Sequence, residues 1–218
     1  MVLIKKKYTE KDKIFRTQSL KWEALCNDII QYLNKKYIVL TITYFDQSFK
    51  TLTNHLNNHS MEYIQIEADW KTLHLNLKTI KASRTNHILL YNKSIQLSVN
   101  PHADISKKEK VCFLMAEHYP IYESDGCIYS FAQSLACTSE VIFYTALDEL
   151  IIKASGGEKM MPFIEMFGFK NGCIDHPLIT QSIKQAQKKI KHESIGDQKV
   201  NSAQAWFYYN CPNLGKTI

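Results

Sequence analysis

Two histidines have a spacing that could hold a metal. His55 and His59 lie four residues apart, which places both imidazoles on one face of a helix, as in many zinc sites. The glutamate of a zinc protease motif is absent, and no third ligand is evident in the sequence. A solvated helix face is therefore the preferred interpretation, and no metal site is expected.

A second group could activate a thiol. His118, Glu123 and Asp125 lie close to Cys127 in the sequence, and a histidine beside a cysteine can generate a nucleophilic thiolate. Spacing alone does not bring these side chains together, and ordinary buried cysteines are far more common. The sequence also lacks a GxSxG motif, a paired-carboxylate signature and a glycine-rich dinucleotide loop. No catalytic residues are expected.

A third stretch looks like part of a phosphate-binding loop. Gly215-Lys216-Thr217 matches the end of a P-loop, but the glycine required five positions earlier is replaced by Asn210. A P-loop also needs a following helix, whose N-terminal amides hold the phosphates. Only Ile218 follows in this sequence. We therefore expect no nucleotide cofactor at this position.

The length and composition predict one ordinary domain, or one domain with a helical appendage, without long linkers. Hydrophobic residues make up 45% of the 218 residues and aromatic residues 11%, while glycine and proline number only seven and five. The net charge of +6 favours acidic partners weakly, and the lysines are dispersed, which argues against a nucleic-acid groove. No two of the six cysteines lie within nine residues of each other, so neither a zinc knuckle nor a redox CxxC is present.

The sequence predicts no export signal and no membrane span. The apolar run Val2–Ile4 is too short for a signal peptide, and no stretch approaches 18 apolar residues. We therefore expect a cytoplasmic bacterial protein whose cysteines are reduced thiols.

Hydrophobic periodicity predicts strands that alternate with helices. Thr17 is the expected N-cap of a helix over residues 19–33, and a second helix is expected around residues 49–56. Apolar, β-branched runs predict strands at residues 37–43, 61–66, 87–91, 111–116 and 141–144. Alternation of this kind is typical of a mainly parallel sheet, which we expect from about Lys13 to Ile151. After Gly156-Gly157 the pattern is helical, with Asp175 as the expected N-cap of a helix that has Pro177 in its first turn.

Three segments resemble SecA, the bacterial preprotein translocase ATPase. Thr9–Ser48, with its IFRT segment, is similar to the start of SecA's second motor domain. Gly168–Lys191, with His-Pro-x-x-Thr and an Ala-Gln-Lys-Lys run, resembles the passage from that domain into the helical scaffold. Met115–Leu150 aligns with the segment around helicase motif six, where Glu117 and Asp125, among others, coincide with family residues. The resemblance covers roughly Thr9 to Lys191.

The residues at the nucleotide-binding motifs differ from those of SecA. In the family, motif six carries arginines that reach the nucleotide phosphates; here those positions are Tyr129, Phe131 and Ser134. The motif-five loop, rich in glycine, arginine and aspartate in SecA, corresponds to residues Asn92–Asn100, which contain none of these. Tyrosine, phenylalanine and serine do not replace the charged guanidinium fork. The resemblance also lacks the first motor domain, which carries the P-loop and the magnesium carboxylate.

The resemblance implies a RecA-like (helicase C-terminal-like), mainly parallel sheet flanked by helices, with a C-terminal helical extension. We expect residues 1–174 to form the motor-domain-2-like unit and residues 175–218 the helical tail. The leading interpretation is a non-catalytic, SecA-like protein-binding or adaptor module in protein secretion or trafficking. We expect no ATPase activity, cofactor or metal, and a protein partner that belongs to the secretion or translocation machinery.

Tyr129, Phe131 and Leu135 are the candidate protein-binding residues, because they make the former nucleotide cleft more apolar. Two outcomes are open: these groups pack inward, or a partner covers them, and we favour the partner. Three other functions are alternatives. The chain could complete an ATPase in trans with a separate first motor domain, bind nucleic acid as a helicase-like domain, or act as a secreted bacterial effector. The sequence leaves the oligomeric state open.

Overall fold

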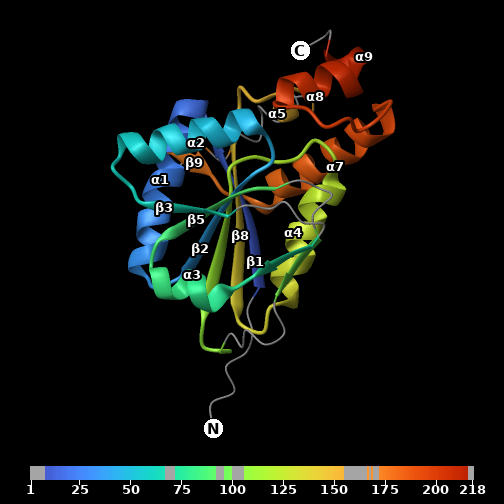
Figure 1. Ribbon diagram of the computed structural model, residues 1–218. Helices are drawn as coiled ribbons and strands as arrows, with labels where there is room; N and C mark the ends of the chain where they lie inside the picture. The colour runs from blue at the N-terminus through green and yellow to red at the C-terminus, as the bar shows by residue number, and fades with distance from the viewer. Residues whose placement is uncertain are drawn as a thin grey trace.

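The computed structural model describes residues 8–66, 72–91, 96–99, 106–154 and 172–215, together with residues 166 and 168. Within them, a seven-stranded sheet has the order β3-β5-β2-β7-β8-β1-β9, and every pairing is parallel except that of β9 with β1 (Figure 1). A separate parallel pair is formed by β4 and β6. The strands are β1 Tyr8–Phe15, β2 Ile38–Thr43, β3 Tyr63–Ile66, β4 Thr72–Leu75, β5 Asn86–Leu90, β6 Gln96–Val99, β7 Lys110–Met115, β8 Thr138–Ala146 and β9 Cys173–Ile174.

Helices cover both faces of the sheet, as the right-handed crossovers of a parallel sheet require. The helices are α1 Gln18–Asn34, α2 Asp46–Asn58, α3 Leu77–Ser83, α4 Tyr122–Ser134, α5 Leu150–Ala154, α7 Pro177–Glu193, α8 Ala203–Asn210 and α9 Pro212–Gly215. Helices α1 and α2 pack in one hydrophobic cluster with one face, and α3, α4, α5, α7 and α8 pack in a second cluster with the other (Figure 1). The expected RecA-like, mainly parallel α/β architecture is therefore confirmed.

Local sequence explains the central elements. All six residues of β2 are buried, which is why this strand has a continuous apolar, β-branched sequence rather than an alternating one. Thr17 caps α1 as expected, its side chain accepting a hydrogen bond from the Leu20 amide at 3.4 Å. The expected N-cap of α7 was wrong by one residue. His176, not Asp175, has the extended backbone and accepts from the Leu178 amide, with Pro177 as the first helical residue.

The sequence did not predict every element. Strand β1 begins at Tyr8, earlier than the expected start near Lys13, and α4 and β9 were not assigned. The expected motif-five region falls partly on β6, while residues 92–95 and 100 lie outside the described residues. Lys216 and Thr217 of the C-terminal Gly-Lys-Thr, and Gly156-Gly157, also lie outside them.

The C-terminal helices share the core of the sheet. The expected boundary between residues 174 and 175 falls between β9 and α7. Apolar side chains of α7 and α8, including Ile183 and Trp206, belong to the same hydrophobic cluster as β1, β2, β7 and β8. Asp197 adds a polar connection, since it accepts from Tyr119 Oη at 2.6 Å and from Trp206 Nε1 at 2.8 Å. Within the described residues, the helical tail therefore has no core separate from the sheet's.

No helix in the described part of the chain is both long enough and apolar enough to cross a membrane.

Candidate functional site

The candidate functional site is a cleft of about 370 Å³ where β1, β7 and β8 end. In parallel α/β sheets, ligands bind outside the carboxyl ends of the strands, which makes this the first place to look for a function. The segments after the three strands contribute Gln18, Lys21, Glu117, His118 and Glu149 to its wall. Residues of α2, α5 and α8 complete the lining.

Glu117, in the wall of this cleft, anchors the turn that leads into α2. Its carboxylate accepts from the amides of Tyr44 and Phe45 at 2.8 and 3.2 Å, and from Ser48 Oγ at 2.5 Å. Tyr44 and Phe45 directly precede α2, and Ser48 lies in its first turn, so Glu117, from the segment after β7, fixes the place where α2 begins. Burial raises the pKa of Glu117 to about 6, against the opposing effects of Lys21 and these hydrogen bonds. Three of its acceptor positions are thus already used in holding the fold.

The only buried lysine among the described residues lies in the same cleft. Lys21 forms an ion pair with Glu149, and its ammonium lies 4.6 Å from the centre of the Trp22 ring. Burial raises the pKa of Glu149, although Lys21 opposes the shift. Lys21 is therefore neutralised by a carboxylate, and Glu117 adds a second buried carboxyl group nearby.

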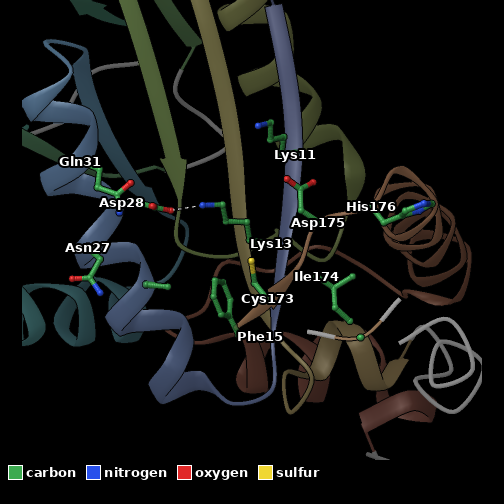
Figure 2. Close-up of a pocket in the computed structure, with 12 residues that line it drawn as sticks. Lys11, Lys13, Phe15, Asn27, Asp28, Gln31, Cys173, Ile174, Asp175 and His176 are labelled. Carbon is green, nitrogen blue, oxygen red and sulfur yellow. Dashed lines mark hydrogen bonds and ion pairs between the residues drawn. The ribbon is translucent and has the colours of Figure 1, made fainter. Parts of the chain in front are cut away.

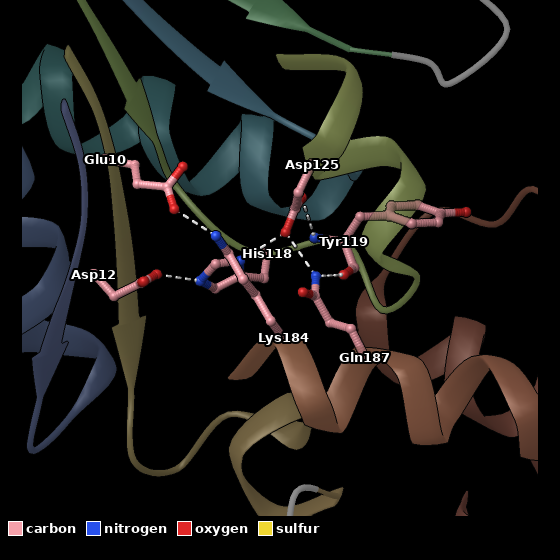
Figure 3. A network of polar contacts seen from close by, with 7 residues as sticks. All are labelled: Glu10, Asp12, His118, Tyr119, Asp125, Lys184 and Gln187. Carbon is pink, nitrogen blue, oxygen red and sulfur yellow. Dashed lines mark hydrogen bonds and ion pairs between the residues drawn. The ribbon is translucent and has the colours of Figure 1, made fainter. Parts of the chain in front are cut away.

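A buried polar network, drawn in Figure 3, begins at His118 in the wall of this cleft. His118 contacts Asp12 through Nε2 at 2.6 Å and Asp125 through Nδ1 at 2.7 Å, and all three side chains are fully or almost fully buried. Burial alone would lower the pKa of His118, but the two carboxylates outweigh it and raise the pKa to about 9. The imidazole is therefore a buried cation held between two anions, with its ring stacked 4.0 Å from Phe143.

The network joins four elements that are far apart in the sequence. Asp125 also accepts from the Tyr119 amide at 3.1 Å and from Gln187 Nε2 at 2.6 Å, and the Gln187 amide donates to the Tyr119 carbonyl at 2.8 Å. Strand β1, the segment after β7, α4 and α7 thus meet at one point (Figure 3). Both imidazole nitrogens contact carboxylates and the side chains are buried, so this arrangement ties the four segments together.

The structure brings together only part of the group suggested by the sequence. His118 and Asp125 are in contact, whereas Glu123 pairs with Lys191 and Cys127 is exposed on α4. Asp12 was missed because it is far away in the sequence. Among the described residues, His118 and the two carboxylates of this group are engaged with other partners rather than gathered around Cys127.

The two histidines of α2 do not form a metal site. His55 stacks against Trp22 with ring centres 5.9 Å apart, and His59 is the C-cap of α2. Within the described ranges, no group of three or more metal-ligating side chains is present.

The three candidate protein-binding residues are packed inward. Tyr129, Phe131 and Leu135 are only 5%, 6% and 2% exposed and belong to the main hydrophobic cluster. Phe131 makes an edge contact with Phe113 of β7 at 5.8 Å, and the Lys184 ammonium of α7 lies 4.9 Å from the centre of the Tyr129 ring. The expectation that these side chains form an exposed apolar face is therefore not met, because the chain's own α7 lies over Tyr129.

A second groove, of about 650 Å³, runs beside β1 on the face covered by α1 (Figure 2). Lys11 and Lys13 of β1 face Asn27, Asp28 and Gln31 of α1 across it. Lys13 forms an ion pair with Asp28 at 2.5 Å, and Cys173, Asp175 and His176 line the end of the groove. This groove was not anticipated from the sequence, since it depends on where the sheet ends.

Comparison with known proteins gives matches to protein translocase subunits. No protein-family model matches the chain. It is 21% identical over 190 residues to the protein translocase subunit SecA of Prosthecochloris aestuarii, covering 86% of this chain and 18% of that protein. The SecA of Thermosipho africanus is 22% identical over 192 residues, covering 86% and 22%. A shorter match, 34% identical over 58 residues, is to the SecA of Alkaliphilus oremlandii and covers 26% of this chain.

These relatives are much longer than the chain, which spans about a fifth of the first two. The sequence resemblance to SecA is thereby confirmed. Over most of its length, the chain is similar to a limited portion of the protein translocase subunit SecA.

Proposed function

We propose that the chain is a non-catalytic, protein-binding module that works with the protein-translocation machinery. The similarity to translocase subunits over 86% of the chain supports the connection with translocation. The non-catalytic part of the proposal rests on the residues at the nucleotide-binding positions.

The observation that carries the proposal is the chemistry of α4. The resemblance places Tyr129, Phe131 and Ser134 where SecA has phosphate-binding arginines. The tyrosine and phenylalanine are core residues here, and Ser134 donates to its own helix at the Phe131 carbonyl. None of the three provides a charged donor for a phosphate, so the usual stabilisation of a transferring phosphoryl group is missing from this helix.

The charges of the cleft agree with this proposal. A nucleotide phosphate placed at the carboxyl ends of the strands would meet Glu117 and Glu149, with Lys21 already paired to Glu149. Buried charges interact strongly because little water screens them. Lys153 and Asp148 also line the cleft, so it carries charges of both signs rather than a cluster of cations that would bind a phosphate.

The residues shared with SecA lie in the part that holds the fold together. Glu117 anchors the turn into α2, Asp125 binds His118, and Gln187 of the Ala-Gln-Lys-Lys run links α7 to α4. A chain that keeps its buried polar framework and lacks its phosphate ligands is suited to a scaffold role, in which its surface contacts a partner.

Calorimetric titration with magnesium-ATP tests the first half of the proposal. We expect no specific binding and no phosphate release from the purified chain. A dissociation constant in the low micromolar range, about −8 kcal/mol, would overturn it and favour an ATPase completed in trans.

Affinity capture from nuclease-treated bacterial cytosol, followed by mass spectrometry, tests the second half. We expect components of the secretion or translocation machinery to be enriched. A matched capture with the unfolded, carboxymethylated chain removes proteins that bind exposed hydrophobic surface. Capture that disappears on nuclease treatment would instead support the nucleic-acid alternative.

A further inference from the structure

The outer edge of β1 is open in the described structure. Strand β1 pairs with β8 along its whole length, from Tyr8 to Phe15. On the other side, among the described residues, it pairs only with β9, and only at Ile14 and Phe15. The backbone of residues Tyr8–Lys13, which we call the β1 edge, therefore has no strand partner on that side in this part of the chain.

The described segment that follows β9 turns away from the β1 edge. Strand β9 runs antiparallel to β1, with Ile174 opposite Ile14, so its continuation would pass along the edge towards Tyr8. The next residue, Asp175, would lie beside Lys13. His176 instead caps α7, and Pro177 begins the helix. Proline has no backbone N–H for a sheet ladder and favours the first turn of a helix, so the sequence diverts the chain here.

The two faces of β1 carry opposite charges. Lys11 and Lys13 point to the groove on the α1 side, whereas Glu10 and Asp12 contact Lys184 and His118 on the α7 side (Figures 2 and 3). Lys13 is paired with Asp28, while Lys11 is exposed and makes no ion pair with any described residue. A strand added to this edge would therefore place one of its side chains beside an unpaired lysine.

This charge pattern discriminates against a second copy of the chain. In an antiparallel pair of β1 edges related by a twofold axis, opposite side chains lie on the same face of the sheet. Lysine would then face lysine in the groove, which is unfavourable. A strand with acidic residues at alternate positions avoids this repulsion and complements Lys11.

We propose that the β1 edge binds an extended, acidic segment of a partner polypeptide, which adds to the sheet as an antiparallel strand in line with β9. Main-chain hydrogen bonds to the free edge supply the affinity, and the side chains entering the groove supply the preference for acidic residues. This inference rests on the proposed protein-binding role and specifies how the partner is recognised.

The test uses a short, end-capped, fluorescent peptide in which valine and glutamate alternate, with a lysine-for-glutamate peptide as its control. We expect fluorescence anisotropy to show binding of the glutamate peptide only. Hydrogen–deuterium exchange should show new protection of the amides of residues 8–13 when this peptide is added. A peptide that binds without protecting β1, or a chain that binds neither peptide, overturns the inference.

Charge reversal provides the matched comparison. Lys11→Glu should weaken binding of the glutamate peptide about five-fold, the size expected for a reversed cross-strand pair, and should improve binding of the lysine peptide. Lys50→Glu makes the same change at an exposed position on α2 and should leave both affinities unchanged. Equal effects of the two variants would indicate nonspecific electrostatic attraction and refute the site.

Sedimentation velocity checks the alternative occupant, since dimerisation abolished by Lys11→Glu would show that the edge pairs with itself and would also refute the proposal. The result of the peptide experiment can be told apart from the result of the test of the proposed function. Tight magnesium-ATP binding would overturn the non-catalytic role without affecting the peptide result, and missing protection at β1 would leave that role in place.

Discussion

His118, which is paired with two carboxylates, should make this protein less stable as the pH rises above neutrality. Its folded-state pKa is about 9, against 6.5 for a free imidazole, because Asp12 and Asp125 stabilise the charged form more than burial disfavours it. A raised pKa contributes stability that is fully present below the unfolded value and is lost as the pH rises through the folded value. The pH window is therefore 6.5 to 9.

The size of the effect follows from the two pKa values. They correspond to about 2.5 kcal/mol of stabilisation at pH 7, falling towards zero by about pH 10. Burial raises the pKa of Tyr44 and of Tyr129 well above 10, so neither phenol ionises in the folded protein within this window. Denaturant unfolding in a reducing buffer, at steps from pH 6.5 to 9.5, should show the free energy of unfolding decrease steadily.

An Asp12→Asn variant provides the internal check. With one carboxylate removed, the folded-state pKa of His118 should move down towards 6.5, so the loss of stability above pH 6.5 should be smaller and should be complete at a lower pH. Imidazole chemical shifts measured by NMR report the same pKa without unfolding the protein. Titration of His118 near 6.5 in the unmodified chain, or a stability that stays constant from pH 7 to 9.5, would refute the charged network.

The remaining predictions concern the core residues of α4, the anchoring of α2 by Glu117, and the attachment of the C-terminal helices. Tyr129→Ala and Phe131→Ala should each destabilise the fold by about 3–5 kcal/mol, since both are core residues; unchanged melting temperatures would show that they are surface groups. Glu117→Ala should cost about 1–3 kcal/mol in denaturant unfolding, because the buried amides of Tyr44 and Phe45, just before α2, lose their acceptor; an unchanged midpoint would contradict this anchoring role. Asp197→Ala should cost a similar amount and accelerate hydrogen exchange around Trp206; exchange that is no faster would show that Asp197 does not hold α8.

The parallel sheet could be predicted because its central strands are buried on both faces. Residues such as those of β2 then form continuous apolar runs, which are visible in the sequence. Helix α4 could not be predicted, because its buried face is not continuously apolar. Its inward face includes Ser124 and Asp125, whose polarity hides the helical period, and Asp125 is buried only because His118 and Gln187 bind it.

The candidate site could be predicted only in part, because it depends on contacts between residues that are far apart in the sequence. The sequence grouped His118 with Asp125, seven residues away, but gave no reason to add Asp12 or Gln187. The loss of charge at Tyr129 and Phe131 was evident from the sequence. Whether those rings face solvent depended on the path of α7, which is determined by packing of the whole chain.

The pairing of β1 with β8 also has a consequence for how the protein is made. Tyr8 of β1 lies opposite Ser139 of β8. The hydrogen bonds between these two strands can form only after β8 has been synthesised. The contact between Asp12 and His118 closes the same long loop. Contacts between such distant segments slow folding, because most of the chain loses its freedom before they form. On the ribosome, both edges of β1 remain unpaired until β8 has emerged, and in that interval a chaperone or a partner strand could occupy them.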